Sequence, residues 1–139
     1  MRGRFLHNQG LIDPVAAAFK RLGGIVRREY PIRPGRYSRY VDLHVVWDSW
    51  RIVVEAELTV DRVDLDVDKA SALEADILLF VVPNSALARK IERKLKDVSR
   101  PVVLVLPLGA ALVLLANKNR LMRALKGRAD FSSNIGGTS

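Results

Sequence analysis

Three acidic side chains in the middle of the chain have the types and the spacing of a metal site. Glu55 and Glu57 end one apolar segment, and Asp42 lies in the apolar segment before it. Side chains at positions i and i+2 of a strand point to the same face of a sheet, so Glu55 and Glu57 are expected to lie together. Two carboxylates ~4 Å apart repel each other by about 4 kcal/mol at an effective dielectric constant near 20. A divalent cation between them would remove that repulsion, and the three acids therefore predict a metal site.

A second interpretation of these acids stays open. They could end a solvated strand and pair with nearby arginines, which are abundant in the chain. The neighbouring side chains Val53, Val54 and Leu58 are of the kind that a core buries, and buried acids need partners. The metal site is therefore the favoured interpretation.

The charges of the chain fall into three blocks. Residues 1–40 hold nine Lys and Arg against two Asp and Glu, residues 41–82 hold three against ten, and residues 83–139 hold eleven against three. A basic protein whose acids are confined to one segment is typical of a surface that attracts a polyanion around a pocket that holds cations. We therefore expect DNA as the partner. The side chains expected to contact its phosphates, rather than to form a merely soluble face, are Arg33, Arg36, Arg39, Arg89, Lys90, Arg93 and Lys94.

Length and composition exclude several classes of protein. The 139 residues suffice for one domain, predicted at 1–126 and followed by a flexible tail at 127–139, with no room for a domain that binds a small-molecule cofactor. The absence of cysteine excludes disulfides, zinc thiolate sites and thiol nucleophiles. The N-terminus lacks the apolar core of a signal peptide, and Pro107 and Gly109 interrupt the apolar segment 101–117. We therefore expect a cytoplasmic protein that does not cross a membrane.

Hydrophobic periodicity predicts an α/β fold. Asp13 before Pro14 is typical of an N-cap and the first helical position. The segment Asp48-Ser49-Trp50 separates two strand-like segments and predicts a β-hairpin. Helices are expected at 15–22, 64–75, 86–96 and 118–126, strands at 25–32, 40–47, 51–58, 77–82 and 102–106, and either a strand or the start of a helix at 110–116. Strands joined first by a hairpin and later by helices imply a mixed central β-sheet flanked by helices.

The order of these elements resembles the α-β-β-β-α-β core of the PD-(D/E)XK nuclease superfamily, which has the restriction-endonuclease-like fold. The likeness covers roughly residues 10–100, with Asp42 on the second strand and Glu55 and Glu57 on the third. In size and layout the chain is similar to the small archaeal Holliday junction resolvases. The resemblance implies that Asp42, Glu55 and the backbone carbonyl of Ala56 bind Mg²⁺ or Mn²⁺. It also implies that Glu57 binds a second ion or orients the attacking water.

Two positions depart from the family pattern. Val41 stands where the family usually has a proline before the aspartate, and Glu57 stands where it usually has a lysine. Active members of the superfamily can carry Glu at this position, and the lysine can move to the following helix, where Lys69 stands. The resemblance therefore implies that Lys69 stabilises negative charge on the scissile phosphate. The other interpretation of Lys69 is a solvent-facing helix residue.

Taken together, the residues and the resemblance predict a Mg²⁺-dependent endonuclease that hydrolyses phosphodiester bonds in branched or duplex DNA and acts as a homodimer. The missing motif lysine keeps open an alternative, a catalytically inactive nucleic-acid-binding protein with the same fold. A nucleotide-binding regulatory domain is less favoured, because Gly23 and Gly24 end a helix instead of forming a phosphate loop. Asp13 and Glu29 are candidates for a supporting acid, and His44 could contact the scissile phosphate or border the site.

Overall fold

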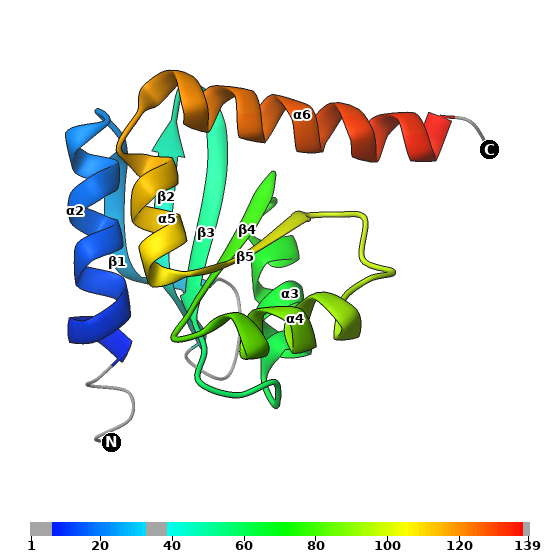
Figure 1. Cartoon of the computed structure of the whole chain (residues 1–139), viewed down its shortest axis with the longest axis horizontal. Coiled ribbons are helices and arrows are strands. Elements are labelled where there is room, and N and C mark those ends of the chain that lie inside the picture. Colours follow the sequence, from blue (N-terminus) through cyan, green and yellow to red (C-terminus); the bar gives the residue numbers. More distant parts are fainter. Residues whose placement is uncertain (1–6, 33–38, 138–139) are drawn as a thin grey trace.

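The protein is an α/β structure built on a five-stranded mixed sheet (Figure 1). The computed structural model describes the backbone of residues 7–32 and 39–137 and the side chains of residues 10–32 and 39–127. The strands are β1 (Ile25–Ile32), β2 (Arg39–Trp47), β3 (Trp50–Ala56), β4 (Ile77–Val82) and β5 (Val102–Pro107), and they lie in this order across the sheet. β1 to β3 pair antiparallel, whereas β3 to β5 pair parallel. The predicted mixed sheet is therefore confirmed.

A tight hairpin joins β2 to β3. Asp48 and Ser49 have φ angles of 47° and 67°. Positive φ at both central residues is the pattern of a type I′ turn, whose twist matches that of two paired strands. The predicted hairpin is confirmed, and its register places Leu43 opposite Val54.

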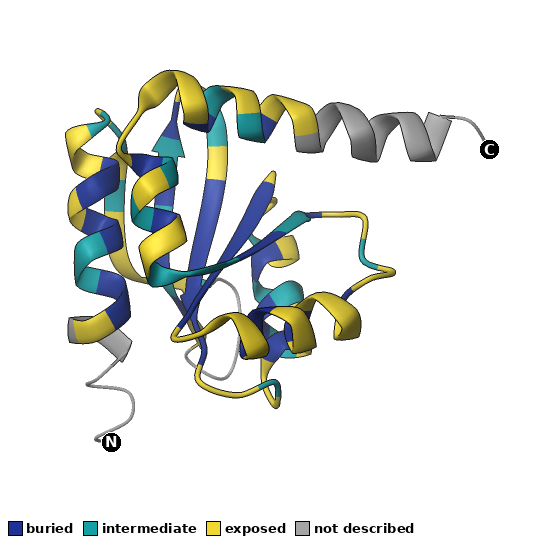
Figure 2. Cartoon of the chain, viewed as in Figure 1, coloured by how far each residue is buried: buried dark blue, intermediate teal, exposed yellow. Residues whose placement is uncertain are grey.

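Helices cover both faces of the sheet. One face packs against α2 (Asp13–Arg21), α5 (Leu108–Leu115) and the start of α6 (Lys118–Gly137), and the other packs against α3 (Val63–Ala72) and α4 (Ser85–Lys94). β4 lies between these layers, and all six of its residues are buried (Figure 2). A continuous apolar run of this length is what a strand covered on both faces requires.

The N-terminal helix begins differently from the sequence prediction. A π-helical segment, η1 (His7–Ile12), runs directly into α2, so Ile12 occupies the N-cap position. The prediction of an N-cap at Asp13 is therefore wrong. Asp13 instead forms an ion pair with Arg28 of β1.

The described chain after β5 is largely helical. Most of the segment 110–116, for which strand and helix were both open, belongs to α5, which buries Ala111 and Leu115 one turn apart. α6 continues as a helix to Gly137, through residues for which composition predicts a flexible tail. Once a helix is nucleated, each further residue adds one backbone hydrogen bond. Within the described residues, no helix is both long enough and apolar enough to cross a membrane.

β1 and β2 change face together at Glu29 and Asp42, where the pairing is interrupted between the pairs Arg28–Leu43 and Tyr30–Val41. Glu29 has a φ of 46°, which breaks the regular alternation of a strand. On one side of this point Leu43 packs in the core beside α2, whereas on the other side Val41 packs in the core beside α3. Tyr30, which pairs with Val41, also packs on the α3 side. The switch therefore brings side chains of both strands to the face on which α3 lies.

Candidate functional site

Two carboxylates bridge β2 and β3 where the strands part. The regular pairing ends at Leu43 and Val54. One position further, the backbone N–H of Asp42 donates to Glu55 Oε1 at 2.8 Å, and the backbone N–H of Ala56 donates to Asp42 Oδ2 at 2.9 Å. These side-chain bonds take the place of the strand ladder. Both predicted metal ligands are therefore held at a fixed position by the backbone of the neighbouring strand.

The helix α3 places an ammonium group beside these acids. Lys69 Nζ lies 2.7 Å from Glu55 Oε2 and 3.3 Å from Asp66 Oδ1, and it donates to the backbone carbonyl oxygen of Tyr40 at 2.9 Å. The Lys69 side chain is only 12% exposed. The interpretation of Lys69 as a solvent-facing residue is therefore wrong, because its charge is directed into the sheet.

Asp66 is a buried acid that lies three residues before Lys69 on the same helix. Its side chain is 3% exposed, and its Oδ2 atom is buried without a hydrogen-bond donor among the described residues. The carboxyl groups of Glu55 and Glu57 lie near it, and both affect its pKa. Two carboxyl groups share a hydrogen bond only when one of them carries a proton. Lys69 pairs with Oδ1, so Oδ2 needs either a proton or a further cation beside it.

The pKa values of the three buried acids are raised, which shows that the positive charge near them does not compensate their burial. Burial, followed by a hydrogen bond from Asp66, raises the pKa of Glu55 to about 8 against the opposing charge of Lys69. Burial and a hydrogen bond with Glu57 raise the pKa of Asp66 to about 7. Burial is also the main cause that raises the pKa of Glu57, and the charges of Glu55 and Asp42 add to it. Burial lowers the pKa of Lys69, but the carboxylates of Glu55 and Asp66 together outweigh this, so that the pKa is raised. One ammonium group is therefore not enough for the acids around it.

The donor atoms of the site suit a hard divalent cation, since every side chain offers carboxylate oxygen. Two buried carboxylate oxygens of the described residues, Glu55 Oε2 and Asp66 Oδ2, have no hydrogen-bond partner. Glu55 Oε2 lies 2.7 Å from Lys69 Nζ, whereas no ion pair within the described part of the chain compensates Asp66 Oδ2. In the present arrangement, however, no three acidic or histidine side chains of the described residues are grouped so that they could hold a metal ion. Lys69 contacts two of the acids, and Asp42 and Glu55 each use an oxygen to accept a backbone hydrogen bond.

A stacked pair of rings lies beside the acids. Tyr30 of β1 and His44 of β2 have ring centroids 4.4 Å apart and planes inclined by 21°. Burial, followed by the charges of Arg51 and Arg27, lowers the pKa of His44. The imidazole is therefore neutral at pH 7, and it acts here as a packing partner of Tyr30.

The structure brings together the four residues proposed for catalysis, namely Asp42, Glu55, Glu57 and Lys69. Sequence reasoning did not single out Asp66. Its spacing to Val63, Lys69 and Ala70 is consistent with the inner face of α3, but the spacing does not show that this face meets Glu55 and Glu57.

The two candidate supporting acids lie apart from this cluster or at its margin. Asp13 pairs with Arg28 and is 46% exposed. Glu29 is exposed at the point where the pairing of β1 and β2 is interrupted. Neither of them is buried with the acids of the site.

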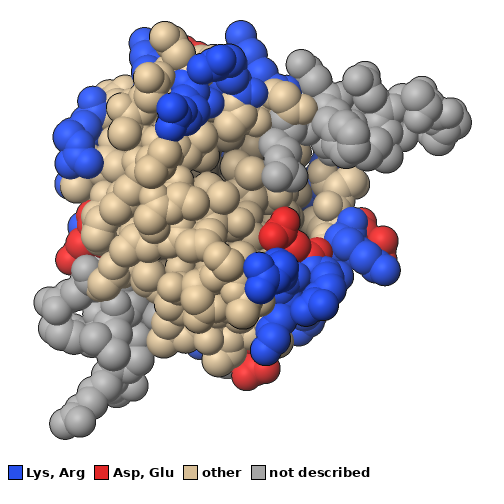
Figure 3. All heavy atoms as spheres, viewed as in Figure 1, with Lys and Arg blue, Asp and Glu red and all other residues tan. Residues whose placement is uncertain are grey.

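The predicted phosphate contacts lie elsewhere on the surface. Arg89, Lys90, Arg93 and Lys94 are on the exposed side of α4, where Figure 3 shows a group of basic side chains. Lys94 also lies 3.6 Å from Asp64 and donates to the carbonyl oxygen of Val60 at 3.0 Å. Arg39 is exposed at the start of β2, whereas Arg33 and Arg36 lie outside the described residues.

No family model matches this chain, and no curated protein matches it. The cluster of Asp42, Glu55, Glu57, Asp66 and Lys69 is therefore the main evidence for what the protein does.

Proposed function

We propose that the protein is a metal-dependent endonuclease that hydrolyses phosphodiester bonds in DNA and has a restriction-endonuclease-like core. The observation that carries this proposal is the buried group of acids and one lysine at the point where β2 and β3 part. A chain keeps several buried acids together only where a cation or a proton compensates them. Perturbed acids of this kind are enriched at catalytic sites.

The order of the elements supports the proposal. A helix on one face precedes three antiparallel strands, and a helix on the other face then leads to a strand parallel to the third. This order resembles the α-β-β-β-α-β core of the PD-(D/E)XK nucleases. Asp42 lies on β2 and Glu55 on β3, the strands on which that resemblance would place the metal ligands.

Each side chain of the cluster has a distinct role in the proposed reaction. Asp42, Glu55, Glu57 and Asp66 would bind Mg²⁺ or Mn²⁺ through carboxylate oxygens, and the carbonyl of Ala56 would assist. The bound ion would make its coordinated water acidic and stabilise charge on the phosphate. Lys69 supplies a fixed positive charge, because Glu55, Asp66 and the Tyr40 carbonyl hold its ammonium group in position. Such a preorganised charge stabilises a phosphate on which negative charge develops.

The surface charge supports DNA as the substrate. The exposed basic side chains of α4 form one group in Figure 3, and a second group lies over the start of α6. Lys and Arg near phosphates release counterions and supply most of the non-specific affinity for DNA. A homodimer with two such surfaces is part of the proposal, because cutting both strands of a branched or duplex substrate requires two sites.

One observation favours the second candidate, a DNA-binding protein without catalysis. Asp42 and Glu55 already accept backbone hydrogen bonds, and Lys69 already pairs with Glu55. In this reading the lysine has replaced the metal as the compensating charge. The buried oxygen of Asp66 without a donor favours the nuclease instead.

The deciding experiment compares two aspartates of α3 in a cleavage assay with Mg²⁺ and with EDTA. Asp66→Asn removes the buried carboxylate, whereas Asp68→Asn changes an exposed one on the same helix and serves as the control. We expect cleavage of labelled branched and duplex DNA in Mg²⁺ for the native protein and Asp68→Asn. We expect no cleavage for Asp66→Asn, for Glu55→Gln, or in EDTA. Cleavage that persists in EDTA, or equal activity of the two aspartate variants, would refute the metal-dependent nuclease.

A further inference from the structure

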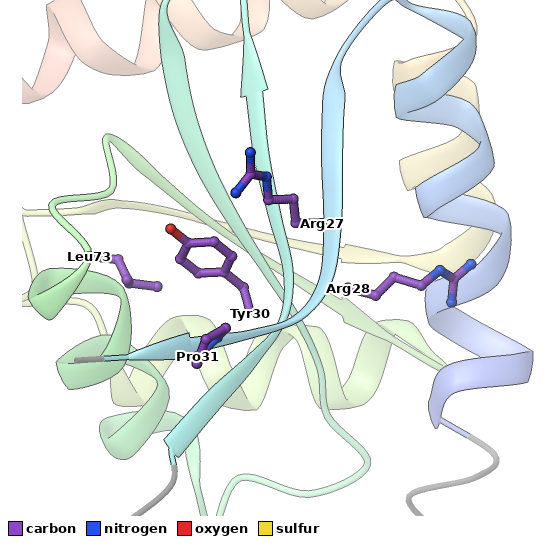
Figure 4. Close-up of a pocket in the computed structure, with 5 residues that line it drawn as sticks. All are labelled: Arg27, Arg28, Tyr30, Pro31 and Leu73. Atoms are coloured by element: carbon purple, nitrogen blue, oxygen red, sulfur yellow. The ribbon is translucent and has the colours of Figure 1, made fainter. Parts of the chain in front are cut away.

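A pocket of about 570 Å³ lies between β1 and the residue that directly follows α3 (Figure 4). β1 contributes Arg27, Arg28, Tyr30 and Pro31 to its wall, and α3 contributes Leu73. Figure 4 shows Tyr30 and Leu73 directed toward each other and Arg27 above the ring. The volume falls within the range of sites that bind small organic ligands.

The aromatic side of the pocket is rigid. Tyr30 stacks on His44 with a centroid distance of 4.4 Å, so its ring is held in one orientation. A ring fixed in this way is a stacking surface for a planar ligand, and aromatic side chains bind unpaired nucleobases by such stacking. Leu73 adds an apolar surface on the opposite side.

The charged side of the pocket suits a phosphate. Arg28 extends toward α2, where it pairs with Asp13. Arg27 is exposed, and within the described residues it forms no ion pair. Its partner in the register of β1 and β2 is His44, so Arg27 lies next to the stacked rings. The guanidinium group is therefore available to a phosphate of the same ligand whose base stacks on Tyr30.

The pocket borders the site of the proposed reaction. Tyr30 pairs with Val41, which precedes Asp42 in the chain. Leu73 follows Lys69 by four residues on α3, a rise of about 6 Å along a helix. A nucleotide in the pocket would therefore be a close neighbour of the phosphate at Lys69.

We propose that this pocket binds an unpaired nucleotide of the substrate, with its base on Tyr30 and its phosphate on Arg27. The inference rests on the proposed nuclease function and specifies its substrate class, namely DNA with an unpaired or displaced nucleotide next to the bond that is cut. A paired base cannot reach the ring of Tyr30, because it must first leave the duplex stack. Intact duplex therefore binds only through its phosphates.

The test measures binding in EDTA, so that it does not depend on cleavage. The probe is a duplex with a single bulged 2-aminopurine, compared with the same duplex in which that base is paired. We expect the bulged duplex to bind about tenfold more tightly, which is the order of the contribution of one stacked base. The fluorescence of the bulged 2-aminopurine should fall on binding, because the base stacks on a tyrosine ring.

The variants separate stacking from folding and from charge. Tyr30→Phe keeps the ring and should keep the preference, whereas Tyr30→Leu should bind both duplexes equally and leave the affinity for paired duplex unchanged. Arg27→Ala should weaken binding of the bulged probe and reduce the slope of log K against log salt concentration by about 1, the value of one lost phosphate contact. The control Arg21→Ala on α2 should change neither the affinity nor the slope. Equal binding of the two duplexes by the native protein, or a preference that survives in Tyr30→Leu, would overturn the inference.

Cleavage in Mg²⁺ then separates this inference from the proposed function. If the native protein cuts DNA but shows no preference for the bulged probe, the pocket inference fails and the nuclease stands. If the native protein prefers the bulged probe but cuts no DNA, the proposed nuclease activity is refuted. The claim that the pocket lies next to a cleaved bond is then refuted as well. Only a preference for the bulged probe together with cleavage next to the bulge supports both.

Discussion

The two faces of the sheet are built from the same strands but have different chemistry. The face beside α2 and α5 is an apolar core that includes Phe19 and Leu43. The face beside α3 carries the buried charged side chains of the described residues, Glu55, Glu57 and Asp66. Burial of apolar surface stabilises a fold, whereas buried charges seldom do so even when they are paired. Both faces bury an apolar core, but only the face beside α3 also uses part of that stability to hold buried acids.

The largest expected effect on stability is on the apolar face. Phe19→Ala removes a ring that is 1% exposed, and it should lower the free energy of unfolding by about 3–5 kcal/mol. Urea denaturation at pH 7 measures this. Val113→Ala, which changes a side chain of a residue that is 56% exposed, is the control and should change stability by less than about 0.5 kcal/mol. A small effect of Phe19→Ala would mean that the core beside α2 contributes little to stability.

Loss of the buried ammonium group should have the next largest effect. Lys69→Met leaves Glu55 and Asp66 without their cation, and breaking a buried pair costs about 3 kcal/mol at pH 8. The loss should shrink at pH 5, where the two acids carry protons. Lys94→Met is the matched control, because its ammonium group pairs with an exposed acid at 3.6 Å.

Lys69→Met also tests catalysis. The loss of one preorganised charge should lower the cleavage rate by about 10² to 10³ and leave binding of DNA nearly unchanged. Glu57→Lys in the same variant restores the common family motif and should recover part of the rate. Full activity of Lys69→Met would show that the lysine has only a structural role.

The acids on the α3 face should make stability fall as the pH rises. The pKa of Glu55 is about 8 in the folded protein against an ordinary value of 4.5, and that of Asp66 is about 7 against 3.8. Between these values the folded state binds more protons than the unfolded state, so the free energy of unfolding decreases with pH. Each group contributes up to about 1.4 kcal/mol per pH unit, so the expected slope is about 2 kcal/mol per pH unit between pH 5 and 7.

Thermal unfolding across this pH range measures the slope, and Glu55→Gln together with Asp66→Asn should flatten it. Mn²⁺ or Mg²⁺ should raise the melting temperature more at pH 8 than at pH 5, because the metal competes with protons for the same carboxylates. A melting temperature that rises with pH between 5 and 7 would contradict the raised pKa values.

The smallest effect on stability is expected at the exposed basic side chains of α4. Replacing Arg89, Lys90 and Arg93 by glutamine should change the free energy of unfolding by less than about 0.5 kcal/mol. For binding of duplex DNA, however, the slope of log K against log salt concentration should become shallower by about 0.9 for each lost phosphate contact. A second variant replaces three exposed basic side chains near the start of α6 by glutamine, for comparison: Lys118, Arg120 and Arg123. An unchanged slope for the α4 variant and a reduced one for the α6 variant would move the DNA surface to α6.

Much of the fold is readable from local patterns. The hairpin follows from Asp48 and Ser49, and the buried β4 follows from its continuous apolar run. Local patterns do not determine where a helix begins, or whether an apolar segment is helical, when these depend on the segments that pack against it. Asp13 is not an N-cap because η1 extends the helix before it, and 110–116 is helical because it packs against α2.

The sequence by itself determined the α/β class, the mixed sheet and the alternation that puts Glu55 and Glu57 on one face. Only the tertiary structure decided that Asp66 joins them, that Lys69 points inward, and that Tyr30 stacks on His44. The physical reason is range. Propensity and periodicity act over a few residues, whereas a pKa, an ion pair or a pocket depends on atoms that distant segments bring within a few ångströms of one another.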